Sequence, residues 1–169
     1  MAVIVKDNGF GIKNIIINEP KTYNSLSFKT LNILINIFRR LENDNKTRVI
    51  ILSGNGKGFS AGHNLKEVRS LKIRSKYLKL FNLCSNVMIQ IVEGRKPVIA
   101  KVHGAAYAAG CQLVASCDLA YSTSDAMFAT PGVNIGLFCS TPMVAVSRKI
   151  HRKRMMKVLI STIVGMISR

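Results

Sequence analysis

The stretch PVIAKVHGAAYAAGCQLVASCD, residues 97–118, decides the fold of this chain. Its first residues, Pro97 to Ala100, are apolar and β-branched after a proline, which predicts a buried strand. Small residues dominate from Gly104 to Gly110, where the backbone can turn sharply and let another molecule approach closely. A short helix is predicted from about Ala109. Free N–H groups at a helix start can hold an anion or an oxyanion, so we expect the functional site here.

The composition predicts one domain with a strongly cationic surface. The chain has 169 residues, 48% of them hydrophobic, which is enough for one core and makes a second independent domain unexpected. Its 25 Lys and Arg residues against 8 Asp and Glu give a formal charge of +17. This excess favours an anionic partner, namely nucleic acid, an anionic membrane surface or a phosphate-bearing cofactor. A Lys-rich surface that only faces solvent explains the charge equally well.

The cysteines, the histidines and the N-terminus indicate a reducing compartment and no metal site. The four cysteines form no CxxC pair, which predicts free thiols. His63, His103 and His151 lack the spacing of metal ligands, so we expect no metal. The first residues resemble neither a secretory signal nor an Arg-rich transit peptide. We therefore expect a cytoplasmic protein, with the mitochondrial matrix as the alternative for a eukaryotic source.

One uncharged segment, residues 126–147, has the length of a membrane-spanning helix. Pro131, Pro142 and the glycines Gly132 and Gly136 divide it into turns and short pieces. We therefore expect buried structure in this segment and no membrane span.

Strand and helix patterns alternate along the chain. Residues 3–17 predict a β-hairpin around the Asn8-Gly9 turn. Ser27 is a predicted N-cap, and apolar residues follow it at helical spacing as far as Leu41. Residues 48–52 predict a strand, and residues 73–92 a helix. The buried face of that last helix is expected to hold Tyr77, Leu80, Phe81, Cys84, Val87, Met88 and Ile91. The alternation predicts an α/β fold with right-handed crossovers.

Three groups of motifs carry a resemblance to a known family. The first has NEPK at residues 18–21 and NSL at 24–26, and the second is GFSAGHNLKE at 58–67. The third has KPVIA at 96–100, HG at 103–104, AGCQL at 109–113 and CDLA at 117–120, and TPGVNIGL at 130–137 extends it. In order and spacing over residues 3–160, the chain resembles the crotonase superfamily of enoyl-CoA hydratases and isomerases. Its variants at 63–64, 109–112 and 138–142 look closest to the enoyl-CoA hydratase domain-containing branch.

The resemblance implies a spiral of ββα turns that binds acyl-CoA thioesters. In such proteins two backbone N–H groups hold the thioester oxygen as it gains negative charge. By position, these donors are those of His63 and Ala109 here. Ala61, His63 and Leu65 are expected to line the arm of coenzyme A, with Lys21 beside it. Coenzyme A is then part of the substrate, not a permanently bound cofactor, and its phosphates are a specific partner for the cationic surface.

The same resemblance predicts that ordinary hydration is weak or absent. Hydratases of this superfamily use two glutamates for general acid and base catalysis. Gln112 and Gly132 stand at these two positions, and no glutamate follows Glu93. Gln112 can bond water but cannot take its proton at neutral pH. His63 acting as acid or base is the remaining route to hydratase activity, since we expect the thiols to be inert and Asp118 to bond local backbone.

Superfamily members continue into a helical subdomain that covers the acyl pocket and helps to form a trimer. That subdomain is expected to be largely missing here, with residues 1–160 forming the core and residues 161–169 a divergent tail. A homotrimer is then expected to be weakened, and a non-functional truncated remnant is one alternative. The other is nucleic-acid binding through Arg74, Lys76 and Lys79, or through residues 148–154.

Overall fold

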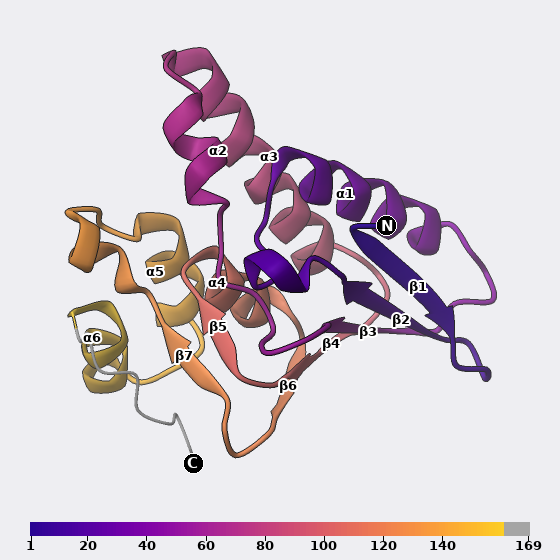
Figure 1. Cartoon of the computed structure of the whole chain (residues 1–169). Helices are drawn as coiled ribbons and strands as arrows, with labels where there is room; N and C mark the ends of the chain where they lie inside the picture. Colours follow the sequence, from indigo (N-terminus) through magenta and orange to yellow (C-terminus); the bar gives the residue numbers. More distant parts are fainter. Residues whose placement is uncertain (161–169) are drawn as a thin grey trace.

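The computed structural model describes residues 1–160 and shows a mixed α/β fold (Figure 1). A main sheet and a small second sheet are flanked by helices. The strands are β1 (Val3–Asp7), β2 (Ile12–Ile17), β3 (Val49–Gly54), β4 (Val98–Val102), β5 (Ala105–Tyr107), β6 (Leu119–Ser122) and β7 (Met127–Ala129). The helices are α1 (Phe28–Glu42), α2 (Leu65–Ser70), α3 (Arg74–Val92), α4 (Ala109–Ser116), α5 (Ser140–Ser147) and α6 (Arg152–Ile160), with 3-10 turns η1 (Pro20–Thr22) and η2 (Pro131–Ile135).

The main sheet has the strand order β1-β2-β3-β4-β6. The predicted hairpin is confirmed, because β1 pairs antiparallel with β2 around Gly9, whose φ is +78°. The pairs β2–β3, β3–β4 and β4–β6 are all parallel. The second sheet contains β5 and β7, also parallel. Parallel neighbours need crossover connections, which here contain α1, α3 and α4 in turn, as expected for α/β structure.

Helices α1 and α3 pack together and cover the main sheet (Figure 1). The predicted N-cap of α1 is confirmed, since the Ser27 side chain accepts from the Thr30 N–H at 3.1 Å. Apolar residues of α1, such as Leu31 and Leu34, are fully buried with Ile15 of β2 and Leu52 of β3. The core therefore lies between the helix layer and the sheet, and it holds the carboxyl ends of β3 and β4 in place.

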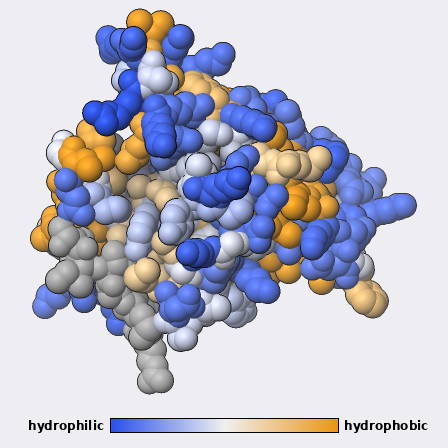
Figure 2. Space-filling model, in the orientation of Figure 1, coloured by the Kyte–Doolittle hydropathy of each residue, from blue (hydrophilic) through white to orange (hydrophobic). Residues whose placement is uncertain are grey.

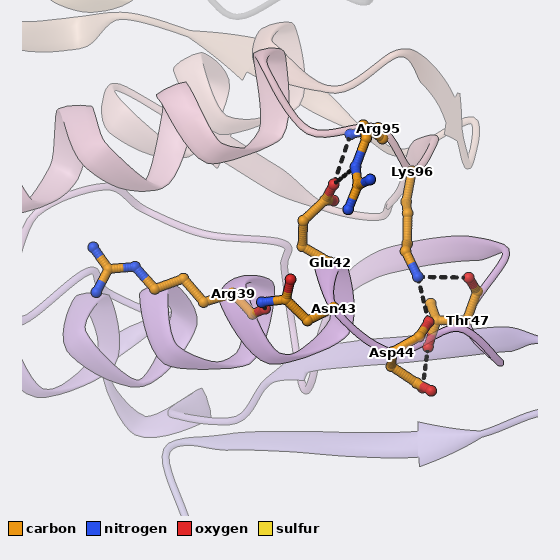
Figure 3. A network of polar contacts seen from close by, with 7 residues as sticks. All are labelled: Arg39, Glu42, Asn43, Asp44, Thr47, Arg95 and Lys96. Carbon is orange, nitrogen blue, oxygen red and sulfur yellow. Dashed lines mark hydrogen bonds and ion pairs between the residues drawn. The ribbon is translucent and has the colours of Figure 1, made fainter.

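A polar cluster ties the C-terminal end of α1 to the start of β4 (Figure 3). Glu42 Oε1 accepts from the Nε of Arg95 at 2.7 Å and from its backbone N–H at 3.2 Å. The Lys96 ammonium donates to the carbonyl oxygens of Asp44 and Thr47. In the part of the chain that the structure describes, Glu42–Arg95 and Asp7–Lys13 are the two ion pairs, so most cations have no acidic partner.

The segment 126–147 is divided into β7, η2 and α5 as predicted, but the expectation that it is buried is wrong in part. Side chains of η2, the loop after it and α5 are exposed, and Figure 2 shows apolar residues at this surface. They are Val133, Ile135, Leu137, Phe138 and Val144. Pro131 follows the end of β7, and Gly136 ends η2 after five residues. These elements are too short to bury all of their apolar side chains. Among residues 1–160, no helix has the length and apolar character needed to cross a membrane.

Candidate functional site

Two chain segments that follow parallel strands lie side by side at the centre of the molecule. Residues 58–63 follow β3, and residues 104–109 follow β4. They pair through isolated bridges, in which Ser60 N–H donates to Ala105 O at 3.0 Å and Tyr107 N–H donates to Ser60 O at 2.8 Å. The carboxyl ends of neighbouring parallel strands thus meet at one place, which is where α/β sheets bind ligands.

Two glycines allow this close approach. Gly62 has a φ of +87°, and a Cβ there would lie 2.9 Å from Tyr107 O and 3.1 Å from Ala109 N. A Cβ on Gly110 would lie 2.2 Å from Ser60 O. The peptides of His63 and Ala109 are therefore held beside each other, and a side chain at position 62 or 110 would force the two segments apart.

The His63 and Ala109 N–H groups are the two candidate oxyanion donors. Within residues 1–160 neither of them donates a hydrogen bond, whereas their neighbours do. Ala61 N–H donates to Tyr23 O at 2.9 Å, and Ala108 N–H donates to Ala129 O at 2.8 Å. Ala109 is the first residue of α4, so its N–H points out of the helix without an internal acceptor. The predicted donors are thus adjacent and available for a ligand oxygen.

Ala108 turns the chain from β5 into α4 in a conformation that is unusual for a residue with a side chain. Its φ is 48° and its ψ is −118°. Such a backbone costs on the order of 1–3 kcal/mol and persists only where surrounding contacts impose it. The Ala129 carbonyl and the Gly62 backbone supply those contacts. Strain at the residue directly before a free helix-start N–H is typical of a functional site.

A third segment, residues 19–26, closes the site from the other side. The fully buried Asn24 side chain donates to Asn55 O at 2.7 Å and to Gly58 O at 2.8 Å, and accepts from Glu19 N–H at 2.9 Å. Leu26 N–H also donates to Gly62 O at 2.7 Å. These bonds place the exposed Lys21, on η1, in the segment that contacts Ala61. Lys21 thus lies two residues before Tyr23, whose carbonyl oxygen accepts from Ala61 N–H.

The His63 side chain packs against protein on two sides. Its Nδ1 lies 3.4 Å from Leu26 O, and its ring meets the Phe81 ring edge-on, with centroids 5.3 Å apart. Burial lowers the pKa of His63, and the contact with Leu26 O opposes that shift only in part. The ring is therefore neutral at physiological pH and positions the loop that carries the His63 N–H.

The structure corrects the predicted role of Phe81. Its side chain is 44% exposed, so it does not belong to the buried face of α3. Helical spacing alone placed it in the core, whereas in the structure its ring meets the ring of His63. Leu65, at the first position of α2, is 54% exposed. Both apolar side chains are available to a ligand.

Gln112 lies on the first turn and a half of α4, and only 7% of it is exposed. Thr141 on α5 donates its hydroxyl to Gln112 Oε1 at 3.1 Å. Thr141 has no sequence signal that links it to the site, because it lies 29 residues further along the chain and only α4–α5 packing joins the two. A carboxamide at this point is neutral and cannot exchange a proton with a ligand.

Gly132 is buried in η2 and has no room for a larger side chain. A Cβ there would lie 2.7 Å from Cys139 Sγ and 2.7 Å from Leu137 O. Gly132 therefore carries no carboxylate, and the turn after η2 also occupies the space that a glutamate side chain would need.

The four thiols are unpaired, and the three buried ones are poor nucleophiles. Burial raises the pKa of Cys84, Cys111 and Cys117 to about 12. Cys111 and Cys117 line a cavity of about 290 Å³ with Val114, Ala115 and Phe128. Gln112 does not line this cavity, so it lies on another side of α4. Asp118 Oδ2 accepts from Val98 N–H at 2.8 Å, which confirms its predicted role as a backbone anchor.

Comparison with known proteins identifies the family. The family model for enoyl-CoA hydratase/isomerase matches residues 7–163. The human enoyl-CoA hydratase domain-containing protein 3, mitochondrial, is 47% identical over 149 residues, which cover 88% of this chain and 49% of that protein. The chain thus spans about half the length of the curated relatives it matches.

Solved structures agree with the sequence relatives. An enoyl-CoA hydratase structure from Mycobacterium smegmatis superposes with a TM-score of 0.94 at 44% identity, covering 98% of this chain and 64% of that one. The structure of human enoyl-CoA hydratase domain-containing protein 3 gives a TM-score of 0.91 at 42% identity, covering 98% of this chain and 66% of that one. The predicted crotonase-like α/β fold is thereby confirmed. The chain belongs to the enoyl-CoA hydratase/isomerase family of the crotonase superfamily.

Proposed function

We propose that this protein binds acyl-CoA thioesters and holds the thioester oxygen with the N–H groups of His63 and Ala109. One observation carries the proposal: the two N–H groups lie side by side across Gly62 and have no acceptor within residues 1–160. A carbonyl oxygen placed between them accepts both bonds. The donors belong to a rigid backbone, so they need little reorganisation as negative charge develops on that oxygen.

Coenzyme A arrives as part of the substrate and lies over the surface made by Lys21, Ala61 and Leu65. Lys21 is exposed on η1, next to the segment that holds Ala61. Within residues 1–160 its ammonium has no acidic partner, and the excess of such unpaired cations in that range supports an anionic ligand. His63 belongs to this surface through its backbone, while its ring is packed against Phe81.

Hydration of an enoyl-CoA is weak or absent in this proposal. Gln112 stays neutral, and the space at Gly132 is filled by Leu137 and Cys139. His63 does not replace the missing carboxylates in this proposal, because its Nδ1 faces Leu26 O and its ring packs edge-on against Phe81. The site then stabilises a negative oxygen without a group that transfers protons.

Calorimetric titration with butyryl-CoA and with its thioether analogue, which lacks the carbonyl oxygen, tests the oxyanion assignment. Two hydrogen bonds of about 1 kcal/mol each predict roughly 30-fold tighter binding of the thioester. Equal affinities would mean that the carbonyl oxygen does not meet these donors. If neither the thioester nor the thioether binds, the proposed function itself is overturned.

Nucleic-acid binding is a second candidate, favoured by the charge of the C-terminal segment. No acidic residue follows Asp125, whereas Arg148, Lys149, Arg152, Lys153 and Arg154 are all exposed. Phosphate contacts release counterions, so genuine binding weakens steeply as salt is raised. An affinity that stays constant between low and physiological salt excludes this candidate.

The names of the curated relatives also bear on the compartment. Five vertebrate relatives of this chain carry the description "mitochondrial". We propose the mitochondrial matrix in place of the cytoplasm that the N-terminal residues led us to expect.

A further inference from the structure

Gln112 is an almost fully buried side chain whose amide nitrogen has no protein partner. Thr141 occupies its Oε1, and no described group accepts from its Nε2. Within residues 1–160 no buried side-chain nitrogen or oxygen is left without a partner, so this Nε2 must keep contact with solvent. Because Gln112 lies outside the lining of the cavity behind α4, that contact is on another side of the helix.

The helix geometry directs the Gln112 amide toward the oxyanion donors. Ala109 and Gln112 are three residues apart on α4, so they share a face with Cβ atoms about 5–6 Å apart. Side chains of a helix tilt toward its N-terminus, which brings the amide back toward the Ala109 N–H. In the structure the Thr141 hydroxyl donates to Gln112 Oε1, and this arrangement leaves the NH₂ group for a ligand.

We propose that Gln112, oriented by Thr141, is a third hydrogen-bond donor of this site and selects acyl-CoA thioesters with an acceptor oxygen at C3, the 3-oxoacyl thioesters. The inference rests on the proposed binding of acyl-CoA. In a 3-oxoacyl thioester a single carbon separates the two carbonyl groups, which matches donors on one turn of one helix. A saturated acyl chain gives the Gln112 Nε2 no acceptor and excludes solvent from it, which weakens binding.

Titration of the purified chain with butyryl-CoA, 3-oxobutyryl-CoA and 3-hydroxybutyryl-CoA tests this specificity. The wild-type protein is expected to bind 3-oxobutyryl-CoA about fivefold more tightly than butyryl-CoA, the value of one additional hydrogen bond. Gln112→Leu removes this preference. Gln112→Glu presents only acceptors when ionised, so it disfavours the 3-oxo compound but still binds the 3-hydroxy compound, whose hydroxyl can donate.

Thr141→Val tests the orienting role without changing the donor. Thr141 is exposed, so the variant is expected to fold, and loss of its hydroxyl should reduce the ratio of 3-oxobutyryl-CoA to butyryl-CoA affinity about twofold. Thr123→Val, at another exposed threonine, is the matched control and should keep the full preference. Equal wild-type affinities for butyryl-CoA and 3-oxobutyryl-CoA, or a preference that survives Gln112→Leu, overturn the inference. Failure of every thioester to bind overturns the proposed function instead.

Discussion

The two halves of the candidate site differ in how they are built. The oxyanion half, defined by Gly62, His63, Ala108 and Ala109, consists of backbone that three segments hold in place. The proton-transfer half, defined by Gln112 and Gly132, consists of single side-chain positions at which neither residue can carry a charge. Main-chain donors survive a change of side chain, whereas an acid or a base is lost with one substitution. The proposed function therefore separates electrostatic binding from proton transfer.

The largest expected effect is a loss of stability when the buried hydrogen bonds of Asn24, next to the oxyanion half, are removed. Asn24→Ala removes three hydrogen bonds that join residues 19, 55 and 58, in a side chain with no exposure. Buried partners left unpaired cost about 1–3 kcal/mol each, so we expect a loss of about 3 kcal/mol of unfolding free energy. Urea denaturation measures it. Asn43→Ala, which removes one exposed bond to Arg39 O, should stay within about 0.5 kcal/mol of wild type.

Gly62→Val breaks the contact between the two donors directly. The added side chain meets Tyr107 O and Ala109 N, so the segments move apart and both bonds to the thioester oxygen are lost. Butyryl-CoA affinity should fall roughly 30-fold.

Gly9→Val is the matched control for this substitution. Its φ of +78° carries a similar backbone strain of about 1–2 kcal/mol, but nothing lies within 4 Å of the added Cβ. It should lose stability while keeping its affinity for the thioester. If both variants bind equally well, the contact at Gly62 does not position the donors.

Much of the oxyanion half could be predicted from the sequence, because glycine and alanine runs after two buried strands restrict where backbone can meet backbone. The small-residue run predicted the helix start at Ala109, and the family resemblance added His63 as the second donor. Two side-chain contacts could not be predicted. The contact of Phe81 with His63 depends on how α3 lies against the loop after β3, and that of Thr141 with Gln112 depends on α4–α5 packing. Periodicity specifies a helical face but not which part of it the sheet covers.

Replacing the His63 ring is expected to have a smaller effect, on the pH dependence of stability alone. The cause is that the ring takes up a proton more readily in the unfolded chain. Burial lowers the pKa of His63 in the folded chain below its ordinary 6.5, so the unfolded state takes up a proton first as pH falls. The His63 contribution to stability is complete above about pH 6.5 and is lost as pH falls from there through the folded-state pKa. When pH is lowered from about 7.5 to 5.5, the stability of His63→Gln should therefore fall less than that of the wild type. Thermal melts at each pH measure this difference. Parallel curves for the two proteins would show that the ring is not held neutral by burial.

The smallest change is expected from restoring a single carboxylate to the proton-transfer half. Gln112→Glu supplies one acid or base, but Gly132 still lacks the second, and Cys139 and Leu137 leave no space for it. Its hydration of crotonyl-CoA should stay within about threefold of the wild-type rate, because general acid and base catalysis needs both groups. A gain of about 100-fold would show that one carboxylate suffices here.

The central claim is that the chain binds acyl-CoA thioesters without transferring protons to them. Its most direct test is to measure binding and hydration on one preparation of the wild-type chain. Crotonyl-CoA is titrated by calorimetry, and its hydration is then followed at a saturating concentration by loss of the enoyl absorbance. The predicted result is saturable binding with hydration at the background rate. Rapid hydration with a pH dependence near neutrality would contradict it and would assign proton transfer to His63.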